Sequence, residues 1–234
     1  MRNSRRISDS RRKRRKQLVR RGVILIGIVC LGIGGFTLVR EKIASSGERG
    51  AITAQKMEEE EWVGAPSLDV QLLDVNEYSR PGTPLKEIKG IVIHYVGNPG
   101  TSAKANRDYF QRLKDAHTTK ASSHFVVGLD GEIVQCIPST EISYASNERN
   151  KDTLSIECCH PDETGKFNEA TYQSMVNLTG WLCARFGLDS QDVIRHYDVT
   201  GKICPKYFVE HEDAWEQFKS DVQTKAEKIK KMNH

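Results

Sequence analysis

The segment 195–205, Arg-His-Tyr-Asp-Val-Thr-Gly-Lys-Ile-Cys-Pro, restricts the fold of this chain more than any other stretch. It carries an imidazole, an ammonium and a thiol on one short loop, at His196, Lys202 and Cys204. Imidazole and thiolate are good ligands for a borderline-soft cation such as zinc, and a catalytic zinc site needs three protein ligands and one open position. The chain must therefore fold so that a third ligand from elsewhere reaches this loop.

His94 is the candidate for that third ligand. It lies at the end of an apolar run, Gly-Ile-Val-Ile-His-Tyr at residues 90–95. A buried strand would present this one polar side chain at its end, toward a cleft rather than toward the core. Alone, a histidine on an apolar strand is more often a satisfied core residue. Together with His196 and Cys204, it is interpreted as a metal ligand.

The rest of the domain alternates strand-like apolar runs with amphipathic helical segments, which is the pattern of an α/β fold. Asp130-Gly131 predicts a tight hairpin turn, and Gly187 suits the position after the end of a helix. We therefore expect a central mixed β-sheet flanked by helices. The expected strands are 88–96, 123–129, 132–137, 153–159 and 193–196, and the expected helices are 103–116, 169–186 and 212–231.

The two polar motifs together resemble those of the type 2, zinc-dependent N-acetylmuramoyl-L-alanine amidases. That family includes phage endolysins, bacterial autolysins and animal peptidoglycan recognition proteins, and the resemblance covers residues 88–218. It implies one zinc ion per chain, held by His94, His196 and Cys204. The implied activity is hydrolysis of the amide between N-acetylmuramic acid and L-alanine in peptidoglycan. The alternative is a non-catalytic peptidoglycan-binding sensor with the same fold, and the presence of the cysteine ligand favours the enzyme.

Glu157 and Lys202 are the candidate catalytic residues. Strand alternation puts Ser155 and Glu157 on one face, and Ser-Ile-Glu matches a strand of bacterial amidases whose glutamate is catalytic. This match implies a general acid/base, whereas the alternative is that Glu157 orients a ligand or pairs with a lysine. Lys202 matches the family's oxyanion-stabilising lysine. Outside that motif it would be interpreted as a solvated loop lysine.

His124 is a candidate substrate contact. Some relatives have a Tyr-His-Phe strand, whereas this chain has Ser123-His124-Phe125. Because a serine is too short to replace the tyrosine hydroxyl, this difference places more of the chemistry on Glu157. It leaves His124 as either a substrate contact or a structural residue.

Four further cysteines of the domain, Cys136, Cys158, Cys159 and Cys183, have two interpretations. They form disulfides, which an extracytoplasmic domain permits, or they are small buried side chains. Cys159 beside His160 is also a conceivable nucleophile and base. No nucleophile-elbow motif or orienting group accompanies that pair, which argues against it.

The N-terminal region predicts a membrane anchor. Residues 1–22 carry eleven Lys or Arg and one acid, and the seventeen residues 23–39 carry no charge. Seventeen residues are near the lower limit for crossing a hydrocarbon core of about 30 Å, and the arginine excess places the N-terminus in the cytoplasm. We expect a basic cytoplasmic segment (1–22), a transmembrane helix (23–39), an extracytoplasmic linker (40–75) and an extracytoplasmic amidase domain (76–234). A signal peptide cleaved near Ala44-Ser45-Ser46 is the alternative.

The basic N-terminus is not interpreted as a nucleic-acid arm. The whole chain carries +4 and residues 1–22 carry +10, so the remaining residues carry −6. A mildly acidic domain has no general nucleic-acid footprint. The expected partners are therefore peptidoglycan and, through the N-terminal helix, the cell membrane.

Overall fold

The computed structural model of the chain describes residues 63–233. The predicted basic segment, the predicted transmembrane helix and most of the predicted linker lie outside these residues. Within 63–233, no helix is both long enough and apolar enough to cross a membrane.

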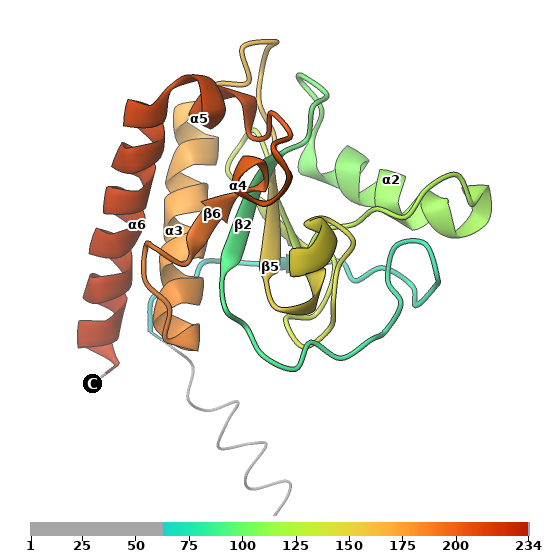
Figure 1. Cartoon of the computed structure of the whole chain (residues 1–234), viewed down its shortest axis with the longest axis horizontal. Coiled ribbons are helices and arrows are strands. Elements are labelled where there is room, and N and C mark those ends of the chain that lie inside the picture. The colour runs from blue at the N-terminus through green and yellow to red at the C-terminus, as the bar shows by residue number, and fades with distance from the viewer. Residues whose placement is uncertain (1–62, 234) are drawn as a thin grey trace, which may run out of the picture. The chain divides into compact units, whose positions relative to one another are not determined.

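One six-stranded mixed sheet forms the centre of the described fold (Figure 1). Its strands are β1 (Asp69–Val70), β2 (Ile91–Tyr95), β3 (Phe125–Val127), β4 (Ile133–Gln135), β5 (Leu154–Cys158) and β6 (Val193–Arg195). They are ordered β1-β4-β3-β5-β2-β6. Only β3 and β4 pair in antiparallel fashion, through the predicted turn in which Gly131 has a φ of 81°. The predicted mixed sheet is thus confirmed.

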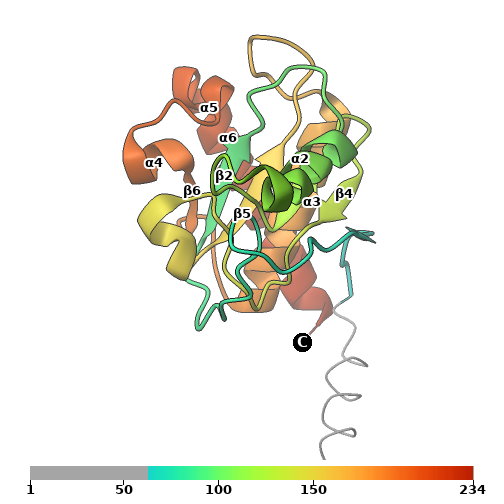
Figure 2. The same cartoon turned by 90° about the vertical axis from the view of Figure 1, so that its right-hand side faces the viewer.

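Helices cover both faces of this sheet. The helices are α2 (Ala103–Ala116), η1 (Asn147–Lys151, a 3-10 helix), α3 (Glu169–Phe186), α4 (His196–Thr200), α5 (Lys206–Glu210) and α6 (Glu212–Met232). Helices α3 and α6 run side by side along one face, and α2 lies on the other side (Figures 1 and 2). The flanked sheet that the sequence predicted is therefore present.

Local signals set the ends of the two helices whose predicted bounds match the structure. The side chain of Asn168 accepts a hydrogen bond from the Thr171 amide at the start of α3, which satisfies a free amide of the first turn. Gly187 ends α3 with a left-handed φ of 70°. Ser102 caps α2 in the same way as Asn168 caps α3. These caps explain why the sequence alone located both helices.

Strand alternation separates two apolar layers. Side chains such as Ile93 and Ile156 pack against α3 and α6. Val126 and Val134 point the other way and pack with Phe110 of α2. Alternate residues of a strand face opposite sides of the sheet. The polar residues that neighbour Ile93 in β2 and Ile156 in β5 therefore face the same side as α2.

The fold begins earlier than residue 76, so the predicted linker extends too far. β1 pairs in parallel with β4, and Leu73 is buried in the core layer beside α2. The two residues of β1 are exposed and join the sheet through main-chain hydrogen bonds. A strand of this kind has no apolar alternation from which the sequence could predict it.

All five cysteines among residues 63–233 are buried and unpaired. The structure therefore agrees with the interpretation of Cys136, Cys158, Cys159 and Cys183 as small buried side chains.

Candidate metal centre

Three side chains from distant parts of the chain come together at one edge of the sheet. The potential ligand atoms of His94, His196 and Cys204 all lie within 4.8 Å of one another. The Sγ atom of Cys204 is 3.8 Å from Nδ1 of His94, and the two imidazole centroids are 4.6 Å apart. All three residues are buried. The structure thus assembles the three residues that the sequence predicted as ligands.

Sheet register explains this meeting. β2 and β6 run parallel, with Ile93 opposite Arg195, so His94 and His196 each follow at the carboxyl ends of neighbouring strands. His196 does not continue β6, as the sequence suggested, but begins α4. After α4 the chain turns back toward the start of that helix. There the Tyr197 amide donates a hydrogen bond to the Cys204 carbonyl oxygen at 2.9 Å. That hydrogen bond closes the loop and brings the thiol to the imidazoles.

Each of the two imidazoles uses its Nε2 atom in a contact with a neighbouring side-chain oxygen. Nε2 of His196 is 3.1 Å from Oδ1 of Asn147. An amide oxygen only accepts, so Nε2 carries the proton and Nδ1 carries a lone pair. This Nδ1 is buried and has no hydrogen-bond partner. Nε2 of His94 is 3.1 Å from Oγ of Ser146, which leaves its Nδ1 beside the Cys204 sulfur.

This donor set fits a zinc ion. A buried nitrogen without a partner is costly, and a cation bound between the side chains would satisfy it. Burial lowers the pKa of His94 well below its usual value and also lowers the pKa of His196, so both rings are neutral, as ligands must be. Burial raises the pKa of Cys204 to about 12. A metal must therefore displace the thiol proton when it binds.

Glu157 lies next to this cluster. It is opposite His94 in the parallel pairing of β5 with β2, so both side chains point to the same face of the sheet. Its Oε2 atom is buried without a hydrogen-bond partner. Burial raises the pKa of Glu157 to about 8, and the positive charge of Lys202 partly opposes this effect. The carboxyl group therefore meets the site with an uncommitted oxygen.

Lys202 is exposed on the loop between α4 and Cys204. Its charge lowers the pKa of His94, of His196 and of Glu157, after the larger effects of burial. An ammonium that acts on all three groups lies close to the candidate metal centre. Its exposure leaves it able to approach a bound substrate.

His124 is fully buried directly before β3. Its side chain is 0% exposed, Nε2 donates to the Glu141 carbonyl at 2.8 Å, and Nδ1 accepts from the Ser155 amide at 3.0 Å. Burial lowers the pKa of His124 to about 4, so the ring stays neutral. With both nitrogens used and no exposed surface, His124 holds β3 to its neighbours. This placement supports the structural alternative and not the predicted substrate contact.

The Cys159 and His160 pair is not arranged for nucleophilic catalysis. The Cys159 sulfur accepts a long contact from the Asn106 amide at 3.7 Å, and Nδ1 of His160 contacts the Asp162 carbonyl at 2.7 Å. Burial raises the pKa of Cys159 to about 12, which disfavours a thiolate. This competing interpretation therefore gains no support.

Sequence reasoning missed Ser146 and Asn147, which contact the two histidines. Both lie where the chain enters η1, in a segment without hydrophobic periodicity and without a motif. Asn147 has a left-handed φ of 52°, a conformation that asparagine adopts more readily than most residues. No feature of the sequence connected it to a histidine 49 positions away.

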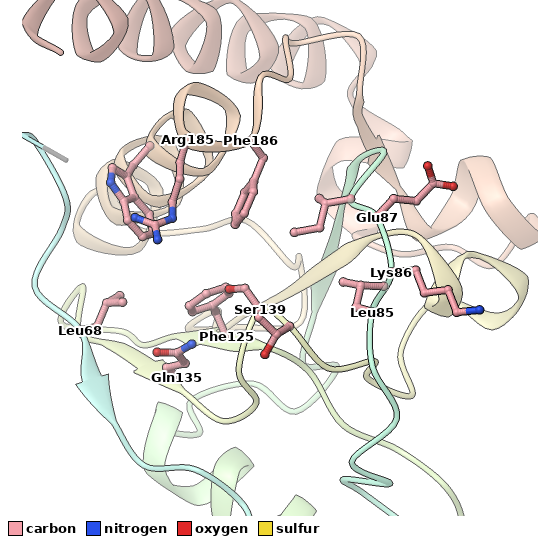
Figure 3. A pocket seen from close by; sticks show the side chains of 12 residues that line it. Leu68, Leu85, Lys86, Glu87, Phe125, Gln135, Ser139, Arg185 and Phe186 are labelled. Carbon is pink, nitrogen blue, oxygen red and sulfur yellow. The ribbon is translucent and has the colours of Figure 1, made fainter. Parts of the chain in front are cut away.

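The cavity in Figure 3 lies elsewhere in the fold. It has a volume of about 500 Å³ and is lined in part by Phe125, Arg185 and Phe186. None of the candidate metal ligands lines it. This cavity and the candidate metal centre are therefore separate features of the fold.

Comparison with protein families gives a match to Amidase_2, described as N-acetylmuramoyl-L-alanine amidase, over residues 84–207. The chain is 37% identical over 161 residues to N-acetylmuramoyl-L-alanine amidase CwlL of Bacillus licheniformis, covering 63% of this chain and 44% of that protein. It is 31% identical over 174 residues to N-acetylmuramoyl-L-alanine amidase BlyA of Bacillus subtilis (strain 168), covering 65% of this chain and 46% of that protein. The chain therefore spans less than half the length of these curated relatives.

Solved structures agree on the fold. PlyL superposes with a TM-score of 0.59 at 21% identity, over 68% of this chain and 98% of PlyL. The catalytic domain of XlyA gives 0.57 at 24% identity, over 67% of this chain and 99% of that domain. At these identities the likeness establishes a shared fold.

Proposed function

Since the chain belongs to the N-acetylmuramoyl-L-alanine amidase family Amidase_2, we propose that it hydrolyses the amide between N-acetylmuramic acid and the L-alanine of the peptidoglycan stem peptide, with zinc as its cofactor. One observation carries the proposal. His94, His196 and Cys204 gather their ligand atoms within 4.8 Å, beside a carboxyl group with an unpartnered oxygen. This combination supplies both parts of a metal-assisted hydrolase.

The ion would be held by Nδ1 of His94, Nδ1 of His196 and the sulfur of Cys204. These are three protein ligands, the number typical of catalytic rather than structural zinc sites. Zinc in such a site supplies Lewis-acid polarisation of a carbonyl and a nucleophilic water at neutral pH.

Glu157 is the group that moves protons in this proposal. Amide hydrolysis forms a bond from the water oxygen to the carbonyl carbon and breaks the bond from that carbon to nitrogen. A cation bound beside Glu157 would oppose the effect of burial and favour the ionised form of its carboxyl group. The carboxylate then accepts a proton from the attacking water and returns it to the departing amine nitrogen of L-alanine. Its Oε2 has no protein partner to displace, which suits this exchange.

Lys202 is the group that stabilises charge. As water adds, negative charge develops on the carbonyl oxygen. An ammonium fixed near that oxygen opposes this charge more in the tetrahedral state than in the ground state, which lowers the barrier. The exposed position of Lys202 beside the buried cluster supports the role.

We also propose that the chain is anchored in the cell membrane, with its N-terminus in the cytoplasm and its catalytic domain outside. The support is sequence alone: eleven Lys or Arg within residues 1–22, followed by seventeen uncharged residues. Peptidoglycan lies outside the membrane, so this topology would bring the domain to its substrate.

Mass spectrometry of digested peptidoglycan tests the activity. The full chain, purified in mild detergent with zinc, should release stem peptides that begin with a free L-alanine amine and leave glycan strands with intact lactyl carboxyl groups. The doubly substituted chain Cys204→Ser with His196→Ala should release neither product. Binding without products would favour the sensor alternative, and new reducing sugar ends or cleavage within stem peptides would identify a different hydrolase.

A further inference from the structure

A single short segment contacts both histidines of the candidate metal centre. Oγ of Ser146 is 3.1 Å from Nε2 of His94, and Oδ1 of the next residue, Asn147, is 3.1 Å from Nε2 of His196. The contacts join parts of the chain that are 52 and 49 positions apart. The same two-residue segment therefore contacts both rings at Nε2, on the side away from their Nδ1 atoms.

The segment is itself held in place. Oδ1 of Asn150 accepts hydrogen bonds from the amides of Ala145 and Ser146, at 3.0 and 2.6 Å. Helix η1, yellow in Figure 2, lies against α4, which begins with His196. A clamped segment can hold the imidazoles still, whereas a freely moving one could not.

Asn147 combines two properties that few residue types share. Its φ of 52° lies in the left-handed region, which glycine, asparagine and aspartate adopt most readily. Its side chain also provides an acceptor oxygen to His196. A glycine at this position would adopt the left-handed backbone conformation but would lack the acceptor oxygen. An aspartate would provide both the backbone conformation and an acceptor oxygen. Substitutions of Asn147 can therefore distinguish the effect of the backbone conformation from the effect of the side-chain acceptor.

We infer that Ser146 and Asn147 are positioning residues of the zinc centre: their side-chain oxygens hold the Nε2 protons, so that Nδ1 of each histidine is the ligand atom. This inference rests on the proposed function, because it concerns the metal of that reaction. A histidine ligand whose second nitrogen is hydrogen-bonded is fixed in tautomer and orientation and becomes a stronger donor. Without such acceptors, each ring would divide its time between tautomers and rotations that do not bind.

Zinc affinity of the full chain, measured by competition with a chromophoric chelator, tests this inference without relying on catalysis. Asn147→Gly and Ser146→Ala should each weaken zinc binding by about 10- to 100-fold. Asn147→Asp, which keeps an acceptor oxygen and tolerates the left-handed backbone, should retain wild-type affinity or exceed it. Melting curves of the zinc-free variants identify any that fail to fold.

Two matched controls lie away from the site. His117 is the other non-glycine residue with a left-handed φ among residues 63–233, at 54°, so His117→Gly repeats the backbone change without touching a histidine ligand. Ser174 donates one hydrogen bond to the Gly131 carbonyl, so Ser174→Ala repeats the loss of a hydroxyl. Both controls should bind zinc as the wild type does.

Three results would overturn the inference. One is unchanged zinc affinity in Asn147→Gly and Ser146→Ala, which would leave the proposed hydrolysis intact. Another is an Asn147→Asp chain that loses as much affinity as Asn147→Gly, since the acceptor would then be irrelevant. The third, a wild-type chain that binds no zinc, would overturn the zinc-dependent function as well. A chain that shows the predicted affinities yet cuts no peptidoglycan would refute the function and support this inference.

Discussion

Arg195 joins the loop that carries His196 and Cys204 to the C-terminal helices, and its replacement should destabilise the fold even without metal. Its guanidinium donates to the Phe208 carbonyl at 3.0 Å and forms ion pairs with Asp198 at 2.9 Å and Glu212 at 2.6 Å. It also lies over the ring of Trp215, 5.3 Å from the centroid. Arg195→Met would keep most of the aliphatic packing and remove every one of these polar contacts.

The magnitude follows from the burial of each partner. The buried hydrogen bond to the Phe208 carbonyl is the largest contribution, since a buried acceptor left without a donor costs about 1–3 kcal/mol. Asp198 is 30% exposed, so its ion pair adds at most about 1 kcal/mol. Glu212 is 63% exposed, and solvent screening makes its pair a minor contribution. We therefore expect Arg195→Met to lower the free energy of unfolding by about 1–4 kcal/mol.

Urea unfolding of the zinc-free full chain measures this loss. A domain of this size changes its melting temperature by about 2–4 °C per kcal/mol, so a drop of roughly 2–16 °C should accompany it. Arg195→Lys should fall between Arg195→Met and the wild type, because one ammonium cannot reproduce the fork of a guanidinium. Arg112→Lys, an exposed position on α2, is the control and should change nothing. Stability of Arg195→Met within 0.5 kcal/mol of the wild type, the usual range for surface changes, would refute the reasoning.

The remaining predictions concern chemistry, metal and topology. Glu157→Gln and Lys202→Ala should both retain zinc, while turnover falls by roughly a hundredfold to ten-thousandfold in the first and on the order of a hundredfold or more in the second. A Glu157→Gln chain that keeps its metal and nearly full activity would remove Glu157 from the mechanism. Zinc at 100 times its Kd should add about 2.7 kcal/mol to the free energy of unfolding in calorimetry, and Cys204→Ser with His196→Ala should abolish the gain. A tag at the C-terminus should be cleaved by protease on intact cells while one at the N-terminus is protected, and the opposite pattern would exclude the proposed topology.

The helices that could be predicted from the sequence are those with strong local signals. The helices α2 and α3 were predicted with the bounds that the structure has, because each combines an apolar stripe with a cap at its start and a left-handed residue after its end. The short elements α4 and α5 were missed. A helix of five residues is stabilised by its tertiary contacts rather than by propensity, so its sequence carries little periodic signal.

The candidate ligands were predictable because they lie in motifs with distinctive chemistry, whereas their supporting residues were not. His196 and Cys204 share one loop, and His94 is the one polar residue within an otherwise apolar run. Ser146 and Asn147 are ordinary loop residues whose contacts with the two histidines form only when η1 packs against α4. The sequence left two roles open for His124 for a related reason, since a polar residue at the start of a strand can face either a cleft or a buried hydrogen-bond network.

Core packing on the far side of the sheet fixes the direction of Glu157. Along β5, Leu154 and Ile156 pack against α3 and α6, so the intervening Ser155 and the following Glu157 must face the other way. A shift of β5 by one residue would bury the carboxylate among isoleucines and turn Ile156 toward the metal ligands. The apolar layer resists that shift, because it would expose or misplace several fully buried side chains at once. The position of the Glu157 carboxyl group beside His94 is thus held by apolar residues on the opposite face of the sheet.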